Sequence, residues 1–272
     1  MKARSWYRVA LATPTGAPQL VLANGEHAGQ AIAEAQKELA GSWAIAFDVA
    51  TAEEIPLGES VGKGHVVRLG EAPATLSTFQ FPVGVLPAVT GAATGFLRGW
   101  IERSDPQLYV VEAQTERDHL VDLYLGIVER LPAADNLEIR LLASFDAAAT
   151  TDVWLTSRIN AKKIIRFLDD HDEELFGNGF VELSVYVRAH RATLRLTEHK
   201  TVVWLAENRE LAPDVERWLK ELAVPQVAAL PSVGDGEHHH YRPAHSRDRK
   251  KLGDELFRQR LRKVDSLKHS GA

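Results

Sequence analysis

Residues 181–206 read VELSVYVRAHRATLRLTEHKTVVWLA, and this stretch decides the fold of the chain around it. Apolar and polar residues alternate from Val181 to Val187 and again from Ala192 to Leu196, and a third apolar run follows from Thr201 to Ala206. A period of two is typical of a strand with one buried face. Short polar segments between the runs favour tight turns. The stretch therefore predicts three consecutive antiparallel strands.

The turns between these strands set their register. Two-residue turns at 190–191 and 199–200 place Tyr186 opposite Arg195, and Arg195 opposite Trp204. The three side chains then form a row on one sheet face, where a guanidinium beside aromatic rings gains cation–π attraction. We therefore take all three as candidate binding residues. An exposed row would be a recognition platform, and a row covered by the N-terminal unit would be an interdomain contact; we favour the covered row.

Helices are expected to cover this sheet on one side. Apolar periodicity around the three strands predicts further strands at 108–113 and 136–145, and helices at 115–131, 160–176 and 213–222. Pro132 and the Gly177 to Gly179 segment supply helix stop signals. Residues 106–223 therefore predict a βαβαβββα unit, in which helices lie on an antiparallel sheet.

The N-terminal part predicts a second, smaller unit over residues 1–105. Strands are expected at 5–12, 18–23 and 42–50, with a helix from an Asn24 cap to about residue 40. Prolines interrupt residues 51–94, which we interpret as an irregular β-rich section. Residues 224–242 are rich in Pro, Gly and His and are interpreted as a linker. The predicted fold class is α+β: two mixed units, then a linker and tail over 224–272.

The tail carries a charge opposite to that of the rest of the chain. Residues 238–272 hold ten Lys/Arg and four acidic residues, a net charge of +6; the whole chain is −5, so residues 1–237 sum to −11. On a helical wheel the apolar residues from Leu252 to Leu267 share one half of the circumference, which predicts a basic amphipathic helix. Arg258 and Arg262 on its polar side are candidate binding residues. Such a helix fits the acidic body itself, a groove on a partner protein, an anionic membrane surface or nucleic acid.

Composition excludes several classes of protein and of site. The chain has no cysteine, which removes disulfides, thiol catalysis and Cys-containing zinc sites. Its apolar runs are shorter than the roughly 18 residues that a membrane span needs. Residues 1–8 are charged and lack an apolar core, so we expect no secretory signal and a cytoplasmic location.

Three clusters of side chains have types suited to chemistry. His238, His239, His240 and nearby His245 have the imidazoles that zinc, copper or nickel prefer, but they lie in a predicted linker without supporting structure, so we expect no functional metal site and no convergence with His171. The acidic run at 169–174 predicts a solvated helix end, with the chain's own basic arm as a second interpretation.

Glu198 and Lys200 have the E-x-K spacing of metal-dependent nucleases, with Glu182 as a further acid. The expected register, however, sets Glu182 opposite His199 rather than Glu198. No phosphate loop, nucleophile elbow or HExxH helix is present. We therefore assign no catalytic residue, no metal site and no cofactor.

These observations favour a non-enzymatic cytosolic interaction or adaptor protein that uses the sheet face and the basic tail. Its partner is expected to be another protein, or the chain's own body through docking of the tail. A metal-dependent hydrolase or nuclease is the alternative, and a nucleic-acid-binding accessory protein is a weaker one.

Overall fold

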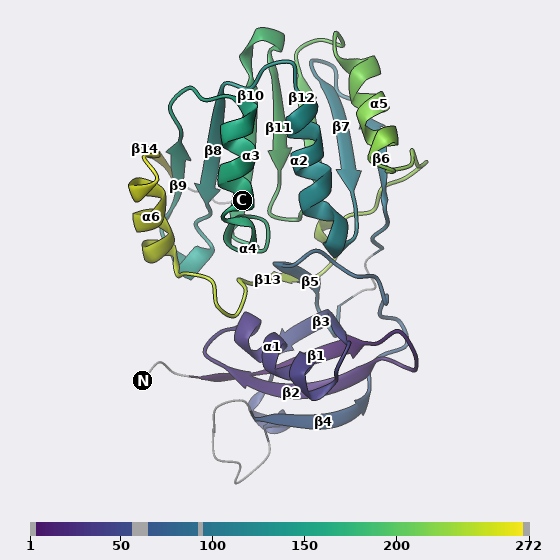
Figure 1. Ribbon diagram of the computed structural model, residues 1–272. Coiled ribbons are helices and arrows are strands. Elements are labelled where there is room, and N and C mark those ends of the chain that lie inside the picture. Colours follow the sequence, from purple (N-terminus) through teal and green to yellow (C-terminus); the bar gives the residue numbers. More distant parts are fainter. Residues whose placement is uncertain (1–3, 56–64, 92–94, 269–272) are drawn as a thin grey trace. The chain divides into compact units, whose positions relative to one another are not determined.

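The computed structural model describes residues 4–55, 65–91 and 95–268 and has the predicted α+β fold (Figure 1). The chain forms two compact units: residues 1–96 with 231–245, and residues 97–230 with 246–272. These units differ from the expected succession of 1–105, 106–223 and 224–272. The difference arises because the predicted linker adds a strand to the first unit, and the predicted tail adds a helix and a strand to the second.

Unit 1 is an antiparallel sheet with one helix. Its elements are β1 (Ser5–Ala12), β2 (Gln19–Gly25), α1 (Ala28–Glu38), β3 (Trp43–Val49) and β4 (Val66–Glu71), and the strand order is β3-β1-β2-β4. The expected ββαβ opening is confirmed. The expected Asn24 cap is wrong: Asn24 is a buried residue of β2 that accepts a hydrogen bond from Arg4, and α1 begins after His27.

A strap that is distant in sequence, residues 231–245, completes unit 1. Its strand β13 (His238–His240) pairs with β5 (Val85–Pro87), and Val233 and Tyr241 are buried in the core. The Tyr241 ring meets the Phe47 ring edge-on at 5.7 Å between centroids. The expectation of a free linker is therefore wrong, because a few apolar residues among the prolines and glycines dock on the sheet.

Gly29 provides a test of how the strap is seated. A Cβ atom at this position would lie 1.8 Å from the carbonyl oxygen of Arg242. Alanine normally improves a helix by up to ~1 kcal/mol over glycine, yet we expect Gly29→Ala to lower the free energy of unfolding by about 1–3 kcal/mol, because the backbone of the strap must move. Hydrogen exchange checks this, since the Tyr241 amide donates to the Gly84 carbonyl and should lose protection. A stabilised variant with unchanged exchange would contradict the contact.

Unit 2 is an eight-stranded antiparallel sheet in the order β14-β9-β8-β10-β11-β12-β7-β6. Its strands are β6 (Gly99–Arg103), β7 (Tyr109–Gln114), β8 (Asn136–Leu141), β9 (Thr150–Leu155), β10 (Val181–Val187), β11 (Ala192–Leu196), β12 (Val202–Ala206) and β14 (Arg262–Lys268). The helices of its first segment, residues 97–230, are α2 (Leu120–Arg130), α3 (Ala161–Asp169), α4 (Asp172–Leu175) and α5 (Ala212–Glu221). Helices α2 and α3 lie across one face of the sheet (Figure 1), as predicted.

The structure adds three strands to those predicted for this sheet, β6, β9 and β14, and divides one helix. β6 forms a hairpin with β7, and β9 pairs with the preceding strand β8. The expected helix at 160–176 is broken at residues 170–171, where α3 ends and the short α4 begins. The sequence pattern missed these features because each depends on which neighbouring strand or helix is available for pairing.

The predicted row of Tyr186, Arg195 and Trp204 is wrong. Tyr186 pairs with Thr193 instead of Arg195, a shift of two residues that keeps Tyr186 and Arg195 on one face. Trp204 pairs with Leu194 instead of Arg195. That second shift is of one residue, which turns a side chain to the opposite face. Trp204 is therefore in the core, edge-on to Trp218. The physical reason is that the connections are longer than two residues, with Arg191 and Lys200 in left-handed conformations.

The C-terminal segment is also only partly as expected. Residues Arg249–Arg258 form a helix, α6, but Arg262–Lys268 form strand β14, which pairs with β9. Arg260 has φ 66°, which ends the helix and turns the chain. The single helix expected to reach Leu267 does not form because β9 offers an open edge for pairing.

Candidate functional site

The apolar side of α6 is packed into unit 2. Leu252, Leu256 and Leu261 are at most 3% exposed, and Gly253 lies against the Trp154 ring. Burial of such side chains contributes about 1.5–3 kcal/mol each. The predicted amphipathic pattern is therefore used for docking on the chain's own body.

Arg249 fixes the start of α6. Its guanidinium forms an ion pair with Asp152 at 3.1 Å and donates to the carbonyl oxygens of Leu142, at 2.7 Å, and Thr150. The Arg249 side chain is 11% exposed. Burial would raise the pKa of Asp152, but hydrogen bonds from Lys263 and Arg249 outweigh it and lower the pKa. The carboxylate is therefore ionised, and the contact is charge-assisted.

One residue of the acidic run at 169–174 contacts the basic C-terminal segment of the chain. Glu174 is buried and accepts hydrogen bonds from the Arg247 backbone N–H at 3.0 Å and from its guanidinium at 2.5 Å. The other acids of the run, Asp169, Asp170, Asp172 and Glu173, are exposed. The four exposed acids fit the expected solvated helix end. Glu174 fits the second interpretation, in which the run contacts the chain's own basic segment.

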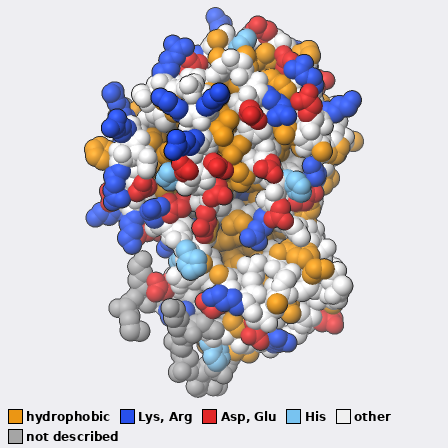
Figure 2. Space-filling model, viewed as in Figure 1, with side chains coloured by type: hydrophobic (Ala, Val, Ile, Leu, Met, Phe, Trp, Pro, Cys, Tyr) orange, Lys and Arg blue, Asp and Glu red, His pale blue; other side chains and the backbone are white. Residues whose placement is uncertain are grey.

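The outer side of this segment forms a surface that we call the basic face. It consists of Lys250, Lys251, Phe257, Arg258 and Arg260, all of which are exposed. Phe257 is 71% exposed, and the Arg258 side chain is 70% exposed beside it. Lys and Arg side chains gather over the part of unit 2 that carries α6 (Figure 2). The candidate residue Arg258 lies on this face. Arg262 does not, because it alternates in β14 with Lys263, which pairs with Asp152 on the side of the sheet that α6 covers.

Tyr186 and Arg195 lie instead within a charged network on the sheet face away from Trp204. The Tyr186 hydroxyl donates to Glu138 at 2.7 Å, and Arg195 donates to Glu182 at 2.5 Å. Burial raises the pKa of Glu182 to about 7, and a hydrogen bond with the Glu198 carboxyl adds to the rise. Arg195 opposes it.

The structure thus brings Glu182 and Glu198 together, although the predicted register separated them. Burial would raise the pKa of Glu198, but the hydrogen bond from Glu182 and one from its own backbone N–H lower it. The proximity of the two carboxyl groups therefore moves their pKa values apart, that of Glu182 upward and that of Glu198 downward.

Lys200 lies close enough to this pair to be attracted by both carboxyl groups. Its side chain is fully buried, and Nζ donates to the Asn178 carbonyl oxygen at 2.7 Å. Burial lowers its pKa to about 7, against the opposing attraction of Glu198 and Glu182. The structure therefore gives Lys200 a place in the interior of unit 2.

The consecutive histidines are divided between two sides of β13. His238 and His240 lie together, with ring centroids 5.2 Å apart. His239 points away from them and contacts Asp48 at 3.0 Å. His171 stacks on Phe167 in unit 2. The strand alternation thus separates His239 from its two neighbours.

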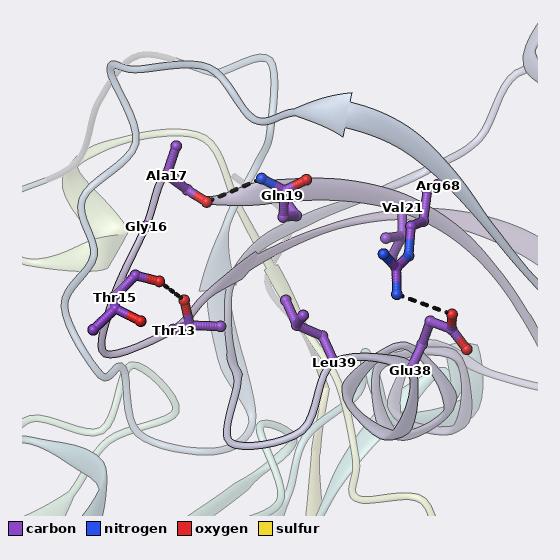
Figure 3. A pocket seen from close by; sticks show the side chains of 9 residues that line it. All are labelled: Thr13, Thr15, Gly16, Ala17, Gln19, Val21, Glu38, Leu39 and Arg68. Atoms are coloured by element: carbon purple, nitrogen blue, oxygen red, sulfur yellow. Dashed lines mark hydrogen bonds and ion pairs between the residues drawn. The ribbon is translucent and has the colours of Figure 1, made fainter.

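A cavity of about 270 Å³ opens in unit 1 between the β1–β2 loop and the end of α1 (Figure 3). Its polar side chains are engaged with one another or with the backbone: Thr13 with the Thr15 carbonyl, Gln19 with the Ala17 carbonyl, and Arg68 with Glu38. A ligand site needs polar groups that converge on the ligand, and these groups instead bond across the rim.

Comparisons with protein-family models, with curated proteins and with solved structures find no match for this chain. Among the described residues, no helix has the length and apolar character needed to cross a membrane. The function is therefore argued from the chain's own side chains.

Proposed function

We propose that this protein is a non-enzymatic interaction protein that binds an acidic segment of a partner protein through the basic face. The observation that carries the proposal is the exposure of Phe257 among cationic side chains. Aromatic residues and arginines dominate the energetics of protein interfaces. Burying a phenylalanine contributes about 1.5–3 kcal/mol, and the surrounding charges favour an acidic partner.

The anchoring of α6 supports this assignment. Its rear side is fixed by buried leucines and by the hydrogen bonds of Arg249, so its outer side chains project from a fixed helix. A preorganised surface loses less conformational entropy on binding than a free arm. The basic face is therefore suited to recognition in its present conformation.

A protein partner accounts for the basic face better than nucleic acid does. Phosphate contacts would neutralise the cations but leave Phe257 exposed, whereas an apolar side chain of a partner covers it. The net charge of −11 over residues 1–237 also opposes phosphate at long range. The hydrolase or nuclease alternative would use Lys200, whose complete burial argues against it.

We expect Phe257→Ser to weaken binding of an acidic peptide about tenfold or more, because the anchor is lost without a change in charge. The probe is a fluorescent peptide of alternating Glu and Leu, followed by anisotropy with the full chain. Lys251→Glu with Arg258→Glu should weaken it further and reduce the dependence on salt. Lys162→Glu is the matched control, because Lys162 is an exposed cation of α3 outside the basic face.

A duplex DNA titration distinguishes the proposal from the nucleic-acid alternative. Micromolar binding to DNA at ~0.15 M salt, lost in the double charge reversal but unchanged in Phe257→Ser, would contradict the proposal. Equal losses for Lys162→Glu and the double reversal would also contradict it, since they would indicate nonspecific attraction.

A further inference from the structure

Strand β13 presents two imidazoles side by side. His238 and His240 are two residues apart, so they project from the same side of the strand. Their rings meet edge-on at an interplanar angle of 75°, and their ligating nitrogens lie within 4.8 Å of each other. Both residues are half-buried. Small rotations of the two side chains would bring both nitrogens to the ~2.0–2.1 Å at which imidazole binds zinc.

The orientation of His238 matches that of a metal ligand. Its Nδ1 lies 2.8 Å from the Gly236 carbonyl oxygen. A carbonyl accepts only from an N–H, so this contact places the proton on Nδ1 and the lone pair on Nε2. Ligating histidines almost always have such a second hydrogen bond, which fixes the ring and its tautomer.

The strand that carries the pair is held on several sides within unit 1. β13 pairs in register with the buried residues of β5, and the Ala88 amide donates to the Glu237 carbonyl at 2.9 Å. His239 contacts Asp48 on the other side of the strand, and Tyr241 is in the core. The sequence suggested an unsupported linker here, and this support removes the main reason for expecting no metal site.

We propose that His238 and His240 form a binding site for a divalent transition-metal ion. Two neutral imidazoles suit Zn²⁺ and bind Cu²⁺ more tightly. Mg²⁺ and Ca²⁺ require oxygen ligands, so this pair does not select them. Water or further donors complete the coordination. This site is independent of the basic face and of the proposed function.

The test is titration of the full chain with Zn²⁺ alone at about pH 7.5, because an imidazole must give up its proton at the ligating nitrogen to bind a metal. We expect one ion per chain, with His238→Ala and His240→Ala each weakening the affinity about tenfold or more. His239→Gln is the matched control, because it changes the adjacent histidine on the opposite side and should keep the affinity. Zn²⁺ should raise the melting temperature of the wild type and of the control.

Copper gives a second readout that does not depend on the stability of the variants. The electron paramagnetic resonance spectrum of the Cu²⁺-loaded wild type should show at least two nitrogen ligands, fewer in each single variant. Zinc binding only at millimolar concentration, or an equal loss of affinity in His239→Gln, would overturn the proposal. A copper spectrum unchanged by the double His238→Ala, His240→Ala variant would also overturn it.

Discussion

Replacing Arg249 with alanine is expected to lower the free energy of unfolding by about 3 kcal/mol or more, because a buried ion pair loses one partner. The guanidinium bonds Asp152 and the carbonyl groups of Leu142, Phe145 and Thr150. Its removal leaves these carbonyls without that donor, while Asp152 keeps its contact with Lys263 at 2.8 Å. Denaturant unfolding of the full chain, followed by tryptophan fluorescence, measures the change.

Arg258→Ala is the matched control for this prediction. Arg258 belongs to the same helix and pairs with Glu255, but its exposure limits the expected change to about 0.5 kcal/mol. Equal effects of the two substitutions would show that Arg249 does not anchor α6. Arg249→Lys should recover only part of the loss, since an ammonium cannot reproduce the fork of the guanidinium.

The second large effect concerns Lys200. Its pKa is lowered to about 7 by burial in the folded protein, whereas an unfolded lysine has a pKa near 10.4. Between these values the unfolded state binds the proton and the folded state does not. The free energy of unfolding therefore rises with pH from about 7 to 10, by an amount on the order of 4 kcal/mol, and the gain disappears below pH 7.

Lys200→Met should remove this rise and stabilise the protein at pH 7 by roughly 1–4 kcal/mol, as replacement of buried charges by apolar groups of similar volume does. The Asn178 carbonyl keeps the Val181 amide as a donor, so no acceptor is orphaned. Unfolding measured across this pH range in both proteins gives the comparison. Parallel pH profiles, or a variant less stable at every pH, would contradict the role of Lys200 burial.

The pH dependence has a second contribution of opposite sign. The pKa of Glu182 is raised to about 7 by burial, so between its unfolded value and pH 7 the folded state holds the additional proton. Stability from Glu182 is present in mild acid and is lost as the pH rises through 7. Wild-type stability should therefore pass a local minimum near neutrality, and Lys200→Met should remove only its alkaline side.

Several features of the fold were predictable from the sequence because they depend on local patterns. Alternation from Val181 to Val187 identified a strand with one buried face, and the spacing of apolar residues from Val215 to Trp218 identified a helix with one buried side. The amphipathic pattern around Leu252 predicted the burial of Leu252, Leu256 and Leu261, but Phe257, from the same predicted apolar side, is exposed.

Tertiary structure decided the register and the partners. Arg191 and Lys200 adopt left-handed conformations that lengthen the turns, which moves Trp204 to the core and brings Glu198 to Glu182. No periodicity in the sequence specifies such turns. The proximity of Arg249 to Asp152, 97 residues earlier in the chain, likewise depends on the folded sheet.

The sequence alone determined the fold class and the charge contrast between the tail and the rest, since composition and periodicity are properties of the chain itself. Only the tertiary structure decided that α6 and β14 belong to unit 2, that the strap completes unit 1, and that Phe257 is exposed while Leu256 beside it is buried. The physical reason is that burial depends on which distant surfaces compete for an apolar side chain, and that competition is settled when the whole chain packs.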